Sequence, residues 1–166
     1  MSRLTDSLQY GQRVRVAGHG PDPAFDVARF EPPELEPGSV RVEVVAVGLN
    51  RADLLESRGR YPAPFGDVQD GLRLEFSGLV TESRSQLYSS GQKVMGIVGA
   101  GALANPLDVH EGSVLEVPRS WSFESAAGVP EAYLTAFDAL FRQATLTAGD
   151  VVLIHAIASS VGLAAA

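Results

Sequence analysis

Alternating apolar and polar positions dominate the first two thirds of the chain. Residues 12–17 alternate, and residues 40–47 form a strong apolar segment after a proline-rich turn. Such patterns, separated by glycine and proline, predict β-strands. Further strands are expected at residues 25–30, 72–82 and 91–98 and, as two short pieces, within 105–118. Many short strands of this kind predict a barrel or a sandwich.

Residues 122–144 carry apolar side chains at helical spacing and predict two helices. Pro130 separates a short helix from a longer one at about 131–143, because proline fits the first turn of a helix. A further short helix is expected at 51–57. The apolar stripe of the longer helix comprises Leu134, Phe137, Leu140 and Phe141.

The last residues have the pattern of a strand, a turn and a helix. Residues 151–155 (VVLIH) predict a buried strand, small residues follow, and Ser159 or Ser160 is placed to cap a helix. Nucleotide-binding units begin in this way. A lone strand has unpaired edges, so we expect residues 150–155 to pair with another chain, to swap or to pack against the barrel.

Composition narrows the class of function. The chain has 166 residues, no cysteine and a net charge of −7 that is spread along the sequence. These properties exclude disulfides and thiolate metal sites and argue against a basic nucleic-acid surface. No apolar run reaches the ~18 residues of a membrane span, and the first residues lack the apolar core of a signal peptide. We therefore expect a cytoplasmic protein without membrane or nucleic-acid partners.

Three segments, in this order, carry a resemblance to a known superfamily. They are residues 47–62 (VGLNRADLLESRGRYP), 74–80 (LEFSGLV) and 126–166. Together they resemble the zinc-free branch of the medium-chain dehydrogenase/reductase superfamily, and in particular the quinone oxidoreductase group with its zeta-crystallin-like enzymes. The resemblance implies a fold that is mainly β with short helices: a GroES-like, partly open β-barrel plus the first strand and turn of a truncated Rossmann domain.

The resemblance also implies a division of the chain. Residues 1–121 match the GroES-like substrate domain, residues 122–149 match connecting helices, and residues 150–166 match the start of the Rossmann cofactor domain. In such enzymes NADPH delivers a hydride to a quinone or an enone in the cleft between the two domains.

Asn50, Asp53 and Tyr61 are the candidate catalytic residues that the resemblance implies. The matching residues of the family lie near the nicotinamide, where a tyrosine can bind the oxygen of the acceptor or relay a proton. The pattern alone gives another interpretation, in which Asn50 caps the helix at 51–57, Asp53 favours its first turn and Tyr61 packs at a turn. Both interpretations remain open at this point.

Five later residues are the candidate contacts to NADPH. The threonine that matches Thr135 faces the nicotinamide in the family, and the turn that follows residue 155 matches the dinucleotide turn. Ser160 stands where that turn usually has a glycine, and only a few alanines follow. We therefore expect NADPH in a full-length parent and doubtful binding by these 166 residues alone, where the turn could instead pack against the barrel. The turn residues concerned are Ala156, Ser159, Ser160 and Gly162.

No catalytic metal is expected. The zinc-dependent branch has a cysteine where this chain has Asn50, and the chain has no cysteine. A zinc site needs about four ligands with defined geometry, and His19, His110 and His155 are scattered along the sequence.

Three functions compete at this stage. The first is the substrate domain of an NADPH-dependent quinone or enone oxidoreductase. The second is an enoyl reductase domain of the polyketide synthase type, whose substrate is a carrier-bound enoyl thioester. The third is a non-catalytic interaction module. A methionine close to the first strand favours the free-standing oxidoreductase.

Overall fold

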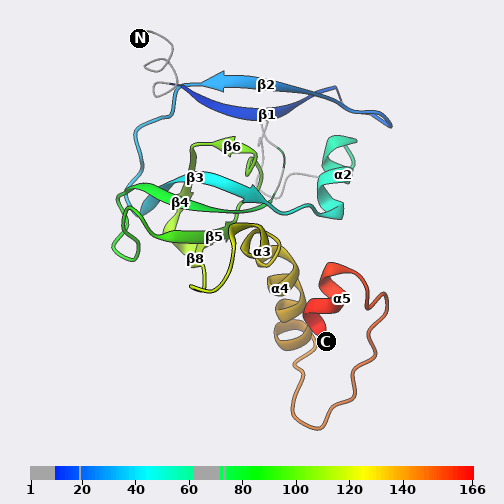
Figure 1. The fold of residues 1–166 in the computed structure, drawn as a ribbon. Coiled ribbons are helices and arrows are strands. Elements are labelled where there is room, and N and C mark those ends of the chain that lie inside the picture. The colour runs from blue at the N-terminus through cyan, green and yellow to red at the C-terminus, as the bar shows by residue number, and fades with distance from the viewer. Residues whose placement is uncertain (1–9, 19, 62–71, 73) are drawn as a thin grey trace.

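The computed structural model describes residues 10–18, 20–61, 72 and 74–166. Within these ranges, eight strands and four α-helices form a β-rich body with most helices at one end (Figure 1). The prediction of a mainly β fold with short helices is confirmed.

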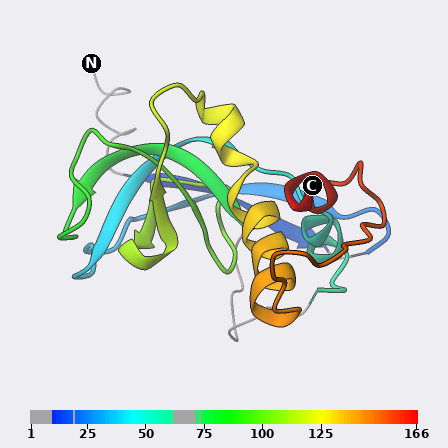
Figure 2. The ribbon, with the colours of Figure 1, turned by 90° about the horizontal axis from the view of Figure 1, so that it is seen from below.

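The strands form two antiparallel sheets. The smaller sheet has the order β2-β1-β6 and the larger the order β7-β3-β4-β5-β8. The larger sheet curls so that it encloses only part of a barrel (Figure 2), as the predicted partly open barrel requires. The strands are β1 (Gly11–Gly18), β2 (Ala24–Phe30), β3 (Ser39–Val47), β4 (Glu75–Ser83), β5 (Lys93–Ile97), β6 (Ala104–Asn105), β7 (Leu107–His110) and β8 (Val114–Glu116).

The central strand β4 is covered on both faces. Phe76 and Val80 belong to the main core, together with residues of β3 and β5. Successive side chains of a strand point to opposite faces, so Glu75 and Ser77 face away from that core. The hydroxyl of Ser77 donates to the carbonyl oxygen of Phe123 at 2.6 Å, which holds the helical segment against this outer face.

Gly78 lies where β3 and β4 approach most closely. The register of this pair shifts between Val44 and Ala46, opposite Gly78. A Cβ at Gly78 would lie 2.2 Å from the carbonyl oxygen of Glu43. The shift is a β-bulge whose extra residue is on β3.

The helices are short and follow the predicted order. Ser122 caps α3 by accepting a hydrogen bond from the backbone N–H of Ser125, and Pro130 opens α4 as expected. The longer helix is not α-helical throughout, because Ala144 N–H bonds to the carbonyl oxygen of Ala139, five residues earlier. The helical elements are α2 (Arg51–Ser57), α3 (Phe123–Ala127), α4 (Pro130–Phe137), the π-helical turn η3 (Asp138–Gln143), α5 (Ser160–Ala165) and the 3₁₀ turn η2 (Glu111–Ser113).

The prediction of a buried strand at 150–155 is wrong. No strand is assigned there, and no described strand pairs with these residues. A strand needs neighbours for its backbone hydrogen bonds, and without them the segment runs as an irregular loop. Val151 is 98% exposed and Leu153 is 82% exposed, so the segment does not pack against the barrel either.

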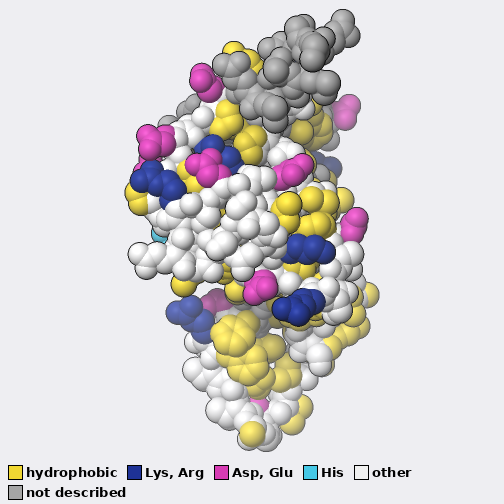
Figure 3. All heavy atoms as spheres, turned by 60° about the vertical axis from the view of Figure 1, so that its left-hand side comes forward, with side chains coloured by type: hydrophobic (Ala, Val, Ile, Leu, Met, Phe, Trp, Pro, Cys, Tyr) yellow, Lys and Arg dark blue, Asp and Glu magenta, His cyan; other side chains and the backbone are white. Residues whose placement is uncertain are grey.

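Hydrophobic side chains gather on the surface of the helical end (Figure 3). The predicted apolar stripe on α4 and η3 contributes to this surface, because Leu134, Phe137 and Phe141 remain about half exposed. Among the described residues, no helix is both long and apolar enough to cross a membrane.

Candidate active site

The start of α2 holds the first two candidate residues. β3 ends at Val47, and Asn50 has the extended backbone of an N-cap at the start of α2. The carboxylate of Asp53, which is buried, accepts a hydrogen bond from the backbone N–H of Asn50 at 2.6 Å. The predicted helix at 51–57 is confirmed with Asn50 at its N-cap position, but the side chain in the capping bond is that of Asp53, whereas the side-chain amide of Asn50 donates to Glu75.

Tyr61 follows α2 and stands at the edge of the described residues. Its side chain is 39% exposed, so its ring lies outside the core. The hydroxyl group of a tyrosine in this setting can donate or accept a hydrogen bond.

A buried glutamate completes this group of residues, and the sequence analysis did not identify it. Glu75, the first residue of β4, is only 1% exposed. Its Oε1 accepts from Nδ2 of Asn50 at 2.8 Å, and its Oε2 accepts from the backbone N–H of Glu131 at 2.8 Å. A glutamate within the apolar run LRLEFSGLV was the available signal, because glutamates are seldom buried unless they are paired.

Burial dominates the electrostatics of this cluster. Desolvation raises the pKa of Glu75, and the charge of Asp53 raises it further, while the hydrogen bonds from Glu131 and Asn50 act in the opposite direction. Desolvation also raises the pKa of Glu131, with additional contributions from Glu75 and Asp53. Burial disfavours the charged form of a carboxyl group, so Glu75 and Glu131 hold their protons to a higher pH than free glutamates do.

The candidate cofactor residues form a second group. Thr135 lies exposed on α4. Ala156 has a positive φ of 53°, and Ser159 caps α5 by accepting from the backbone N–H of Gly162 at 3.0 Å. A Cβ at Gly162 would lie 2.4 Å from the carbonyl oxygen of Ala156, so this glycine permits a tight turn. Ser160, the first residue of α5, is exposed.

The two groups are linked through α4. This helix packs against α5, as Figure 1 shows, which brings Thr135 into the same part of the molecule as the turn at 156–162. The start of α4 is in turn bonded to Glu75, and Glu75 is bonded to Asn50. Glu75 therefore connects Asn50 to the start of the helix that carries Thr135.

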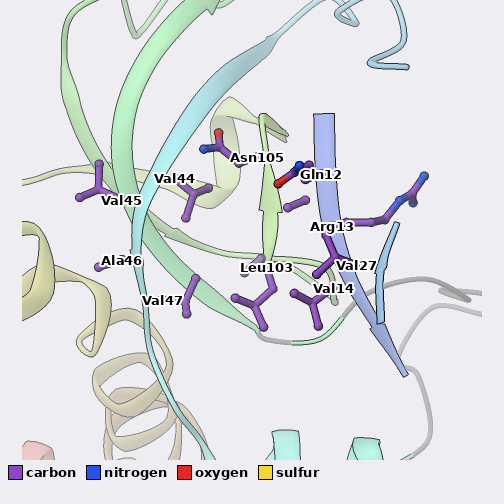
Figure 4. A pocket seen from close by; sticks show the side chains of 12 residues that line it. Gln12, Arg13, Val14, Val27, Val44, Val45, Ala46, Val47, Leu103 and Asn105 are labelled. Atoms are coloured by element: carbon purple, nitrogen blue, oxygen red, sulfur yellow. The ribbon is translucent and has the colours of Figure 1, made fainter. Parts of the chain in front are cut away.

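A separate cavity of about 300 Å³ lies between the two sheets (Figure 4). Val14, Val44, Val47 and Leu103 are among the apolar side chains that line it. None of the predicted site residues lines this cavity, so it is distinct from both clusters.

The histidines and acidic residues give no metal centre in the described part of the chain. No three His, Asp or Glu side chains are grouped there as ligands would be. His110 instead caps the turn η2, where its Nδ1 accepts from the backbone N–H of Gly112 at 3.1 Å. The absence of a catalytic metal stays a prediction.

Curated relatives of this chain include polyketide synthases. The phenolphthiocerol synthesis polyketide synthase type I Pks15/1 of Mycobacterium bovis is 42% identical over 135 residues, which are 79% of this chain and 6% of that protein. Erythronolide synthase EryA2 of Saccharopolyspora erythraea is 41% identical over 167 residues, which cover 96% of this chain and 4% of that protein. The chain thus spans a small part of these relatives. No family model matches it.

Several solved structures share the fold. The quinone oxidoreductase of Coxiella burnetii matches with a TM-score of 0.81 and 30% identity, over 94% of this chain and 52% of that one. CurK enoyl reductase matches with a TM-score of 0.84 and 26% identity, over 93% and 49%. The Escherichia coli quinone oxidoreductase in complex with NADPH matches with a TM-score of 0.77 and 27% identity, over 93% and 48%.

These neighbours are quinone oxidoreductases and enoyl reductases of the medium-chain dehydrogenase/reductase superfamily. This chain is the GroES-like N-terminal portion of that fold and spans about half the length of the matching structures. The resemblance seen in the sequence is confirmed, and the polyketide synthases fit its enoyl reductase branch. The chain is therefore part of a reductase domain of this type.

Proposed function

We propose that this chain forms the substrate side of an NADPH-dependent enoyl reductase of the polyketide synthase type. The observation that carries the proposal is the kind of protein found among the sequence relatives. Eight polyketide synthases match this chain at 31–42% identity over 79–98% of its residues. The solved structures do not separate the two functions, because quinone oxidoreductases and CurK enoyl reductase match at 26–30% identity. The sequence relatives favour the second of the three functions expected from the sequence over the first.

Reduction of an enoyl thioester requires two additions to its double bond. NADPH, when bound, supplies the hydride for the β-carbon. The electron pair of the double bond then moves toward the thioester oxygen, so hydrogen-bond donors at that oxygen lower the barrier. A general acid must finally deliver a proton to the α-carbon.

Tyr61 is the residue of this chain that we assign to the proton or to the thioester oxygen. Its hydroxyl group can donate a hydrogen bond. Tyr61 follows the end of α2, and its side chain is partly exposed. The backbone of Asn50 is held at the start of α2 by the carboxylate of the buried Asp53.

Thr135 and the turn at 156–162 are the residues that we assign to NADPH, at its nicotinamide and its phosphates. Thr135 exposes a hydroxyl group on α4 that can contact the carboxamide of the nicotinamide. The absence of a side chain at Gly162 gives the tight turn that a dinucleotide site needs. The hydroxyl of Ser159 is engaged in capping α5, so the phosphates would depend on Ser160 and the backbone of the turn.

Reduction of a quinone is the second candidate function. It is favoured by the quinone oxidoreductase of Coxiella burnetii, which superimposes with a TM-score of 0.81. Tyr61 would have the same role in this reaction, because a quinone that accepts a hydride also needs a hydrogen-bond donor at its developing negative oxygen.

A competition between the two substrates tests the proposal. The protein at its natural length is assayed for NADPH oxidation with a crotonyl thioester and, separately, with a benzoquinone. We expect a higher kcat/KM for the thioester. A higher kcat/KM for the quinone would overturn the proposal in favour of the oxidoreductase, and no turnover with either would favour the interaction module.

A further inference from the structure

Glu75 makes an unusual pair of hydrogen bonds for a buried carboxylate. It is 1% exposed, and each of its oxygens accepts one bond from a different element. Oε1 accepts from the side-chain amide of Asn50, which caps α2, and Oε2 accepts from the backbone N–H of Glu131 in the first turn of α4. One side chain thus ties two helix starts together.

The space around Glu75 leaves the carboxylate little freedom. Gly48 lies against it, and a Cβ at Gly48 would come within 1.9 Å of Oε1. The backbone N–H of Gly48 also bonds to the carbonyl oxygen of Glu75 at 3.3 Å. The loop that leads from β3 to Asn50 is therefore closed over the carboxylate, and the side chain cannot swing away from its two donors.

The bond to Glu75 also fixes which way the amide of Asn50 faces. An ionised carboxylate only accepts hydrogen bonds, so the NH₂ group of Asn50 must face Glu75 and Oδ1 must point elsewhere. Thr135 follows Glu131 by four residues and lies on the same side of α4. The orientation of Asn50 and the placement of Thr135 consequently depend on one group.

We propose that Glu75 is a positioning residue that holds Asn50 and the start of α4 as one unit on the substrate side of the cleft. Its effect on catalysis rests on the proposed function, but the double hydrogen bond does not. The titratable groups that act on it are Asp53 on α2 and the carboxyl group of Glu131 on α4. Both must be considered in any test that varies pH.

The first test uses nuclear magnetic resonance of the ¹⁵N-labelled 166-residue chain. The reporters are the side-chain NH₂ signals of Asn50 and the backbone N–H signal of Glu131. Because both groups bond to one carboxylate, we expect both signals to follow a single titration as the pH changes. Different midpoints, or no titration at either signal, would overturn the proposal even if no variant folds.

Two variants distinguish the titration of Glu75 from that of Glu131. Glu131→Gln keeps the backbone N–H but removes the nearby titrating group, so the shared titration must persist. Glu75→Gln has a single acceptor oxygen and can keep only one of the two bonds. We expect the shared titration to disappear and at least one reporter to shift. Unchanged signals at both reporters in Glu75→Gln would contradict the assignment.

Kinetics distinguish this inference from the proposed function. In the protein at its natural length, we expect Glu75→Gln to lower kcat for the crotonyl thioester about tenfold or more, with KM changed little, because misplacement mainly affects the reacting geometry. Glu124→Gln on the surface of α3 is the matched control and should behave as the wild type. A wild type that reduces no thioester would refute the proposed function alone, whereas full activity in Glu75→Gln would refute the positioning role alone.

Discussion

Gly48 is the residue that leaves room for the buried carboxylate. The Cβ of an alanine there would lie 1.9 Å from Oε1 and 2.4 Å from Cδ of Glu75. We expect Gly48→Ala to lower the free energy of unfolding by about 1–3 kcal/mol, as overpacking does. Urea denaturation measures this change. Gly128→Ala is the control, because its Cβ would meet nothing within 4 Å, and a Gly48→Ala chain as stable as that control would refute the close packing.

Tyr61 can be tested by removing only its hydroxyl group. If this group delivers the proton, we expect Tyr61→Phe to lower kcat/KM for an enoyl thioester by about 10²-fold or more, the usual contribution of a general acid. The measurement is steady-state NADPH oxidation by the protein at its natural length. Tyr10→Phe, which changes an exposed tyrosine before β1, should leave the rate unchanged. Equal losses in the two variants would remove Tyr61 from the chemistry.

The contrast between Asn50 and Glu75 shows which site residues a sequence pattern can reveal. The cap formed by Asn50 and Asp53 involves residues three positions apart, so local rules predicted it. Glu75 bonds to residues 25 and 56 positions away. No local pattern encodes such partners, and only the cost of burying a glutamate in an apolar strand pointed to a special role.

At the scale of elements, the start of α5 and the turn at 156–162 share one capping residue, Ser159. The hydroxyl of Ser159 accepts from the backbone N–H of Gly162 at 3.0 Å. Loss of such a cap costs about 1 kcal/mol, so we expect faster hydrogen exchange at the Gly162 amide in Ser159→Ala. Ser160→Ala is the matched control, since this neighbouring serine is the first helical residue. Equal exchange in the two variants would show that the cap does not hold α5.

The elements that the sequence predicted well are those whose pattern reflects their surroundings. β3 alternates because Val40 and Val42 enter the core while Glu43 faces solvent. Residues 151–155 have the composition of a buried strand, but a strand also needs partners, which the pattern of a single segment cannot supply. The π-helical turn η3 was missed for a similar reason, because its apolar spacing fits an α-helix equally well.

At the scale of the whole molecule, two carboxyl groups withdrawn from solvent make the free energy of unfolding depend on pH. The pKa values of Glu75 and Glu131 are raised above their ordinary value of 4.5. In the interval between 4.5 and the raised values, the folded chain binds more protons than the unfolded chain, so this contribution to stability falls as pH rises. The lowered pKa values of Glu111, Glu124 and Asp150 have the opposite effect in more acidic solution.

We therefore expect the midpoint of thermal unfolding to be higher at about pH 5 than at about pH 8, where free carboxyl groups are ionised. Replacement of one of these two carboxyl groups, as in Glu131→Gln, should reduce this difference. Glu116→Gln, at an exposed residue of β8, should leave it unchanged. If the unfolding midpoint of Glu131→Gln fell between the two pH values as much as that of the wild type, the pH dependence would come from other groups.

The loop at 151–155 exposes apolar side chains on the surface of the molecule. Val151 and Leu153, two positions apart, are 98% and 82% exposed. Exposed apolar segments of strand-forming residues are templates for pairing between chains, so we expect the apparent mass in sedimentation velocity to rise with concentration. The double variant Val151→Lys/Leu153→Lys should stay monomeric, because two like charges would oppose pairing. Leu87→Lys, at a leucine that is 68% exposed between β4 and β5, should associate as the wild type does. A wild type that stays monomeric at every concentration, or a double variant that still associates, would show that this loop is not the contact.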